Sequence, residues 1–182
     1  DLETAMCLRV FALGVGCAIV AVILYRTMHA VEHLIHKWMP NVWIRAAAGA
    51  LAVVGMSLLV GSPRYNGAGM DMALNAVGGN ADWYSFLLKM LFTAVTLSAG
   101  FKGGEIVPTF FIGATFGCVV GPLIGLSPAF SAALGMSALF AAVVNCPLAS
   151  VVLACEIFGN NGILLYASAI FTAFAFSGYS SL

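Results

Sequence analysis

Hydrophobic residues form long blocks along this chain, and short polar or glycine-rich breaks separate them. Apolar runs cover residues 6–24, 46–60, 86–99, 109–126, 129–144 and 163–176. The first run continues into an amphipathic end that stops before Pro40, so we expect one long helix there. An α-helix rises about 1.5 Å per residue, and about 20 apolar residues cross a bilayer core of ~30 Å. The pattern therefore predicts membrane helices.

Several apolar segments are too short to cross a bilayer as simple helices. Residues 70–77 are bounded by glycine-containing loops, and Asn145-Cys146-Pro147 separates the run 129–144 from the short piece 148–158. Broken helices in hydrocarbon are tolerated only where the freed backbone is buried in protein or lines a cavity. The sequence thus predicts an all-α integral membrane fold with broken and re-entrant helices.

The composition supports a membrane location. Hydrophobic residues make up 62% of the 182 residues and charged residues only 8%, whereas about a quarter of an ordinary soluble domain is charged. Seven basic and seven acidic residues balance, so no charge field favours nucleic acid. The five cysteines lie in apolar surroundings without the paired spacing of a metal or redox site. We expect a lipid-embedded protein without cofactor, metal or nucleic-acid partner.

The hinge GFKGGEIVP places a carboxylate, Glu105, between long apolar segments. A helix that starts after Gly103 and Gly104 presents unpaired N–H groups and the positive end of its dipole. Pro108 fits the first turn, where its missing N–H costs nothing. Such an end can hold an anion, and discontinuous helices commonly build transporter sites. The alternative is a kink in which Glu105 reaches the interface or pairs with Lys102.

Two stretches, GGEIVPTFFIGATFG and NCPLASVVLACEIFG, resemble the CLC family of chloride channels and anion/proton antiporters. The resemblance implies that residues 1–182 form the second of that family's two inverted repeats. The chain starts DLETAM without an initiator methionine, so we expect a fragment in which the first repeat, with the gating glutamate, is absent. The resemblance also implies an anion site in which the backbone amides around Glu105 and Ile106 face the ion. The implied anion-binding residues are Gly104, Glu105, Ile106, Val107, Pro108 and Tyr179.

The acid in the middle of this motif resembles the fluoride-exporting branch, because most chloride-handling members carry a bulky apolar residue there. The resemblance therefore implies fluoride/proton antiport, with Glu105 acting on selectivity or proton coupling. A chloride channel or chloride/proton antiporter of the same fold is the alternative. A prokaryotic plasma membrane and a homodimer formed through residues 147–176 are also implied. The family's anion-facing tyrosine matches either Tyr179 or a residue just beyond Leu182.

One competing motif indicates an enzyme. The segment His29-Ala30-Val31-Glu32-His33 matches the H-x-x-E-H pattern of zinc proteases, with Glu105 as a candidate third ligand. However, it lies at the end of a long apolar helix near Trp38, where aromatic and basic side chains mark the interface. We therefore favour interfacial anchoring and expect no enzymatic activity. A structural subunit or a cation transporter would explain the hydrophobicity but not the acidic hinge.

Other polar residues in apolar runs have two readings each. Lys89 either neutralises an acid within the membrane or extends its ammonium to the membrane surface, and we expect the second. Thr93, Thr96 and Ser98 either bond back to their own helix, which is commoner, or face a pore. Three glycines share one helical face at a spacing of four, which predicts close helix contact in lipid. They are Gly113, Gly117 and Gly121.

Overall fold

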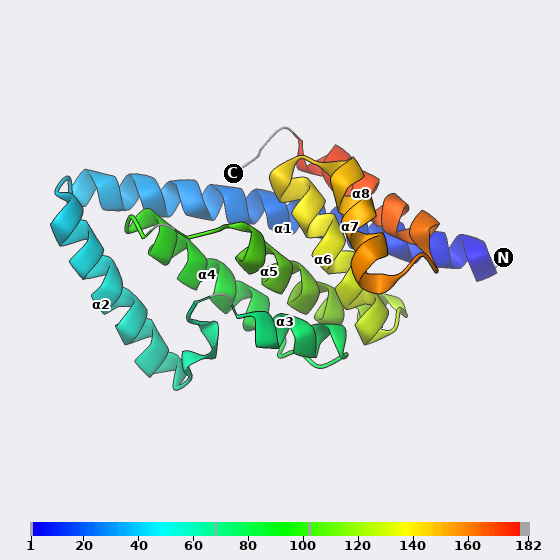
Figure 1. Ribbon diagram of the computed structural model, residues 1–182, viewed down its shortest axis with the longest axis horizontal. Helices are drawn as coiled ribbons and strands as arrows, with labels where there is room; N and C mark the ends of the chain where they lie inside the picture. Colours follow the sequence, from blue (N-terminus) through cyan, green and yellow to red (C-terminus); the bar gives the residue numbers. More distant parts are fainter. Residues whose placement is uncertain (1, 68, 102, 179–182) are drawn as a thin grey trace.

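The computed structural model describes residues 2–67, 69–101 and 103–178, and every regular element in this part is helical. Figure 1 shows the arrangement of the α-helices. Their bounds are α1 Leu2–Trp38, α2 Val42–Val60, α3 Met70–Val77, α4 Ser85–Ser98, α5 Ile106–Val120, α6 Pro128–Val144, α7 Pro147–Phe158 and α8 Ile163–Ser177. Two 3₁₀ turns, η1 Pro63–Tyr65 and η2 Gly121–Ile124, complete the order. The all-α prediction is confirmed, and residues 70–77 form a separate short helix as expected.

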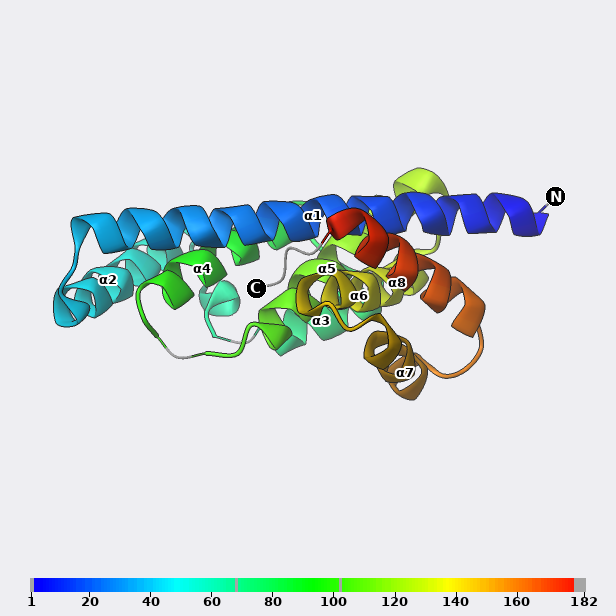
Figure 2. The same cartoon turned by 90° about the horizontal axis from the view of Figure 1, so that it is seen from above.

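Helix α1 runs along the length of the molecule (Figures 1 and 2), and most of the other helices lie below it in the view of Figure 2. Its 37 residues correspond to about 55 Å of helix. One face packs against α4, α6 and α8, and Leu13, Cys17 and Leu24 on that face are fully buried. Among the described residues, three helical segments are long and apolar enough to cross a membrane: Thr4–Trp38, Val42–Val60 and Ile106–Ile124.

Helices α5 and α6 pack closely because glycines bring their backbones together. A Cβ atom added at Gly113 would lie 2.5 Å from the carbonyl oxygen of Gly135. An added Cβ at Gly117 or Gly121 would overlap Ser131. The predicted contact through the small-residue face is confirmed, and its partner is α6.

The helix break at residues 145–147 lies where the sequence predicts it. Asn145 ends α6 in the left-handed conformation, with φ of 57°, and α7 begins at Pro147. Pro is favoured in the first turn of a helix, where its lack of an N–H removes no hydrogen bond. The chain therefore turns at residues 145–147 and enters α7 without a continuous helix.

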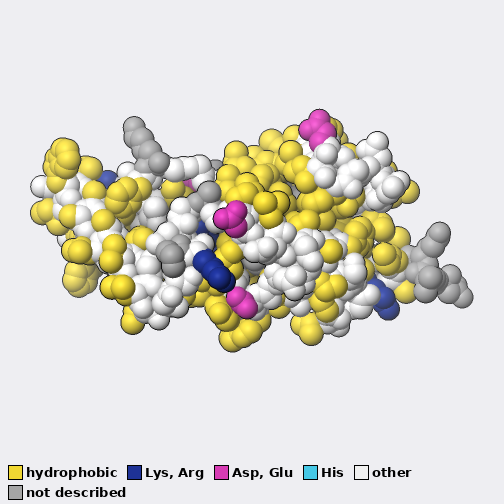
Figure 3. Space-filling view, turned by 60° about the horizontal axis from the view of Figure 1, so that its bottom comes forward, with side chains coloured by type: hydrophobic (Ala, Val, Ile, Leu, Met, Phe, Trp, Pro, Cys, Tyr) yellow, Lys and Arg dark blue, Asp and Glu magenta, His cyan; other side chains and the backbone are white. Residues whose placement is uncertain are grey.

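Helix α2 packs on the rest of the molecule through few residues. It extends away from the main body in Figure 1, and only Gly49 of this helix is buried. Leu59 is 89% exposed and Trp43 84% exposed. Figure 3 shows hydrophobic side chains spread over one face of the molecule with few charged groups between them. An apolar surface of this kind fits contact with lipid or with further protein.

Candidate anion site

The hinge between α4 and α5 leaves backbone N–H groups free at the start of α5. The first hydrogen bond of the helix runs from the N–H of Thr109 to the carbonyl oxygen of Glu105, at 3.1 Å. No hydrogen bond is present in the described structure for the N–H of Ile106 or Val107, and Pro108 has none to offer. The start of α5 therefore presents two amide donors and the positive end of the helix dipole.

Glu105 begins α5 without bonding to its own helix end. Its side chain makes no capping hydrogen bond, and it is exposed. The Thr109 hydroxyl donates to the Glu105 carbonyl oxygen at 2.7 Å, which holds the backbone of the first turn. Lys102, the alternative partner of Glu105, and Tyr179, the sixth predicted anion residue, lie outside the described residues. Gly104, Ile106, Val107 and Pro108 stay contiguous with Glu105 at the hinge.

One cavity, of about 360 Å³, connects the hinge to α4, and we call it the α4 cavity. Its hinge side is lined by Gly103, Gly104, Val107 and Pro108. Its α4 side is lined by Lys89, Phe92, Thr93, Thr96 and Leu97. These α4 positions are spaced as neighbours on one helical face. The cavity therefore follows one face of α4 and ends at the hinge.

A second cavity, of about 240 Å³, lies next to Glu105, and we call it the Glu105 cavity. It is lined by Met28, His29, Glu32, Leu97, Ser98 and Glu105. Two polar residues of the H-x-x-E-H motif thus lie beside the hinge carboxylate. Within residues 2–67, 69–101 and 103–178, however, no group of three or more His, Cys, Asp and Glu side chains is placed to hold a metal ion. The arrangement does not support the zinc-protease alternative.

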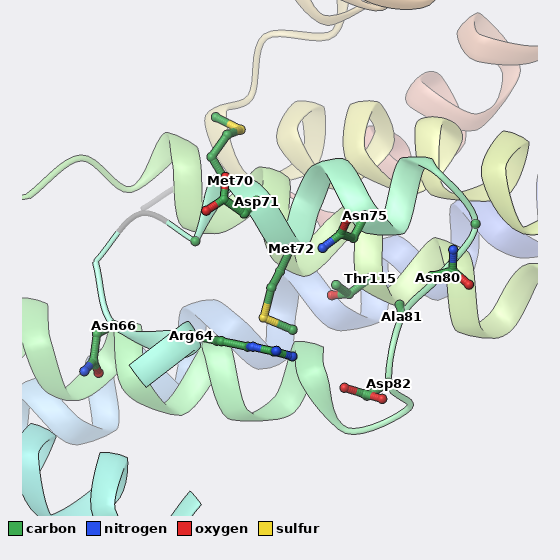
Figure 4. A pocket seen from close by; sticks show the side chains of 12 residues that line it. Arg64, Asn66, Met70, Asp71, Met72, Asn75, Asn80, Ala81, Asp82 and Thr115 are labelled. Atoms are coloured by element: carbon green, nitrogen blue, oxygen red, sulfur yellow. The ribbon is translucent and has the colours of Figure 1, made fainter. Parts of the chain in front are cut away.

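A larger cavity, of about 740 Å³, lies away from the hinge (Figure 4). It follows the loops on both sides of α3, and its lining includes Arg64, Asp71 and Asp82. Asp71 lies in the first turn of α3, where an acidic side chain suits the positive end of the helix dipole. Opposite charges line the same space, so it has no single-sign field for an ion. We interpret it as the polar surface of the α3 region.

The prediction for Lys89 is wrong. Its side chain does not reach the molecular surface but is only 2% exposed. The ammonium donates to the carbonyl oxygen of Tyr65 at 3.1 Å and to that of Gly67, and it lies 5.4 Å from the ring centre of Phe111. Helix periodicity alone could not reveal this, because both acceptors belong to a loop 22–24 residues away.

The hydroxyl groups of Thr93, Thr96 and Ser98 on α4 do not all bond back to their own helix. The Thr96 hydroxyl donates to the carbonyl oxygen of Phe92 at 2.7 Å, which is the expected bond back to its own helix. Thr93 makes no such bond in the described structure and lines the α4 cavity. Ser98 lines the Glu105 cavity. The commoner outcome thus holds for one of these three residues.

Discontinuous helices whose ends open onto cavities commonly form the binding sites of membrane transporters. Residues 1–178 match the sequence profile of the family described as Voltage gated chloride channel. The chain belongs to that family.

Individual relatives refine the assignment. The chain is 30% identical over 181 residues to a Chloride/fluoride channel protein of Pseudomonas syringae pv. tomato, covering 96% of this chain and 40% of the relative. It is 32% identical over 122 residues to the H(+)/Cl(-) exchange transporter ClcA of Vibrio vulnificus, covering 59% of this chain and 26% of the relative. The solved structure of a CLC-type fluoride/proton antiporter matches with a TM-score of 0.94 and 28% identity, over 100% of this chain and 46% of that chain.

These similarities confirm the CLC fold and the resemblance to its fluoride branch. The chain spans less than half the length of the relatives it matches. The similar proteins are channels and exchangers by description, and the chain itself is an integral membrane protein of this family.

Proposed function

We propose that this chain is the second inverted repeat of a CLC transporter that exports fluoride from a prokaryotic cytoplasm in exchange for protons. The observation that carries the proposal is the hinge itself. The free N–H groups of Ile106 and Val107 adjoin the exposed carboxylate of Glu105, in a chain similar to a chloride/fluoride channel protein and a fluoride/proton antiporter.

The backbone and the side chain of the hinge have different tasks in this proposal. The amides of Ile106 and Val107 bind the anion, because free N–H groups at a helix start favour negative charge. Glu105 takes up and releases protons, because its exposed carboxylate is an acid–base group at the hinge. Gly103 and Gly104 carry no side chains of their own, and this leaves room for a small ion to approach.

Two anions, fluoride and chloride, are candidates for the ion that the full protein transports. The proposed branch rests on Glu105, which replaces the bulky apolar residue of most chloride-handling members. Chloride/proton exchange on the same fold is the second candidate, and the similarity to the H(+)/Cl(-) exchange transporter favours it. Both candidates use the same backbone site, so they differ in the anion that moves.

Transport by the full-length protein in liposomes tests the proposal. We expect fluoride efflux from loaded vesicles at least about tenfold faster than chloride efflux, together with proton entry recorded by a pH electrode. Vesicles without protein give the leak of each ion. Chloride flux equal to or above fluoride flux would favour the second candidate, and fluoride flux without proton movement would remove the exchange mechanism.

A further inference from the structure

Lys89 places its ammonium in the interior, and in the part of the chain that the structure describes no Asp or Glu side chain pairs with it. Only 2% of the residue is exposed. Every partner of the ammonium in the described part of the chain is uncharged: two carbonyl oxygens and the Phe111 ring face. A buried charge is costly unless another charge compensates it. Two carbonyl dipoles and one ring supply only part of that compensation.

Neighbouring groups do not supply the missing negative charge. Tyr65 lies beside Lys89 in the lining of the α4 cavity, but burial raises the pKa of its phenol, so it stays neutral. Its hydroxyl pairs with Ser85 at 3.1 Å. No Asp or Glu lines the α4 cavity. The compensating charge for Lys89 is therefore not found among the described side chains around the cavity.

Thr93 adds a second unused donor on the same helical face. It is 7% exposed and lines the α4 cavity one turn from Lys89. Its hydroxyl has no hydrogen-bond partner in the part of the chain that the structure describes, unlike that of Thr96, which bonds to Phe92. The residue is buried, but its hydroxyl oxygen keeps some accessible surface, so it is open to the cavity that it lines. An ammonium and a free hydroxyl thus line one cavity.

We propose that the α4 cavity binds a small monovalent anion between the Lys89 ammonium and the Thr93 hydroxyl. The cavity volume of about 360 Å³ leaves room for the ion with part of its water shell. The same cavity reaches Gly103 and Gly104, so it connects this site to the amides of the hinge. An ion at this site would therefore be held before or after it binds to those amides. The choice of fluoride as the ion rests on the proposed function, whereas the need for an anion rests on Lys89.

Anion titration of the purified full-length protein tests the site. The key variant is Thr93→Val, which removes the hydroxyl and keeps the shape of the side chain. We expect fluoride affinity at this site, measured by calorimetry, to fall about tenfold, as loss of a hydrogen bond to a charged group implies. Thr172→Val on α8 is the matched control, since Thr172 lines neither the α4 cavity nor the Glu105 cavity, and should change affinity less than about twofold.

Lys89 variants give an independent reading. Lys89→Arg keeps the charge and should retain the site, whereas Lys89→Met should lower the number of bound fluoride ions by one. If Lys89→Met does not purify as a single folded species, the threonine pair decides alone. Unchanged affinity in Thr93→Val, or an equal loss in both threonine variants, would overturn the inference.

The same titrations separate this inference from the proposed function. If the wild-type protein transports chloride and not fluoride, the proposed function fails, and chloride titrations of the two threonine variants then decide the site. If the wild-type protein exchanges fluoride for protons and Thr93→Val binds it normally, the site fails and the proposed function stands.

Discussion

At the scale of single residues, the backbone of the hinge and the Glu105 carboxylate line different cavities. Gly103, Gly104 and Val107 face the α4 cavity, whereas Glu105 lines the other cavity with His29 and Glu32 of α1. A carboxylate beside a bound anion would repel it. In the proposed exchange, the two cavities give the anion and the proton separate approaches to the hinge. This arrangement suits exchange of one for the other.

Replacing Glu105 by glutamine tests that division. Glu105→Gln keeps the size of the side chain and removes the proton-carrying group. We expect fluoride to move still, while fluoride-driven proton flux falls about 100-fold, in the range usual for loss of an acid–base group. Liposome flux with parallel fluoride and pH electrodes measures both.

Glu156→Gln on α7 is the control for this experiment, because Glu156 is exposed and lines neither cavity. It should leave both fluxes unchanged. Full proton coupling in Glu105→Gln would show that the carboxylate does not carry the proton.

The sequence predicts the hinge residues but not what surrounds them. Glycines, Pro108 and a lone acid mark the break in a local pattern. Which cavity each group faces depends on how α1 and α4 pack around the hinge. Helix α1 lies far from the hinge in sequence, so a local pattern could not show this packing. The wrong expectation for Lys89 has the same origin, since the carbonyl groups that hold it come from the 65–67 loop.

At the scale of helices, the α5 and α6 pair positions the site. The amides at the start of α5 keep their direction only if that helix is held firmly, and α6 holds it through backbone contact at Gly113 and Gly117. Burial of oily surface gives little drive between helices in lipid, so close packing of small residues supplies much of the stability. The glycine spacing made this face predictable, although the sequence did not identify α6 as its partner.

Gly117→Ala should therefore weaken the whole fold. The added methyl group would overlap the backbone of Ser131, which cannot move as a flexible side chain does. We expect a loss of about 1–3 kcal/mol in the free energy of unfolding, as for overpacked cores, and a lower melting temperature in detergent. Gly55→Ala in α2 is the control, since an added Cβ there meets nothing within 4 Å. Equal melting temperatures for the two variants would contradict close α5–α6 packing.

At the scale of the whole molecule, large apolar faces remain uncovered. Leu164 on α8 is 81% exposed and Leu148 on α7 is 74% exposed, and α7 and α8 lie together at one end (Figure 1). The predicted dimer through residues 147–176 would cover these side chains with a second copy. Lipid would cover the equally apolar face of α2. Both surfaces are hydrophobic, so composition alone could not assign a partner to either.

Leu164→Trp distinguishes the two kinds of surface. A bulky ring in the centre of a packed interface disturbs its fit, whereas a ring in lipid finds room. We expect the full-length variant to shift from dimer toward monomer, as measured by light scattering in detergent and by single-molecule subunit counting in vesicles. Leu59→Trp on α2, at a position 89% exposed, is the matched control and should remain dimeric. Dissociation by Leu59→Trp alone would place the interface on α2 instead of α7 and α8. The proposed fluoride path should persist in the monomer, because both hinge cavities lie within one chain.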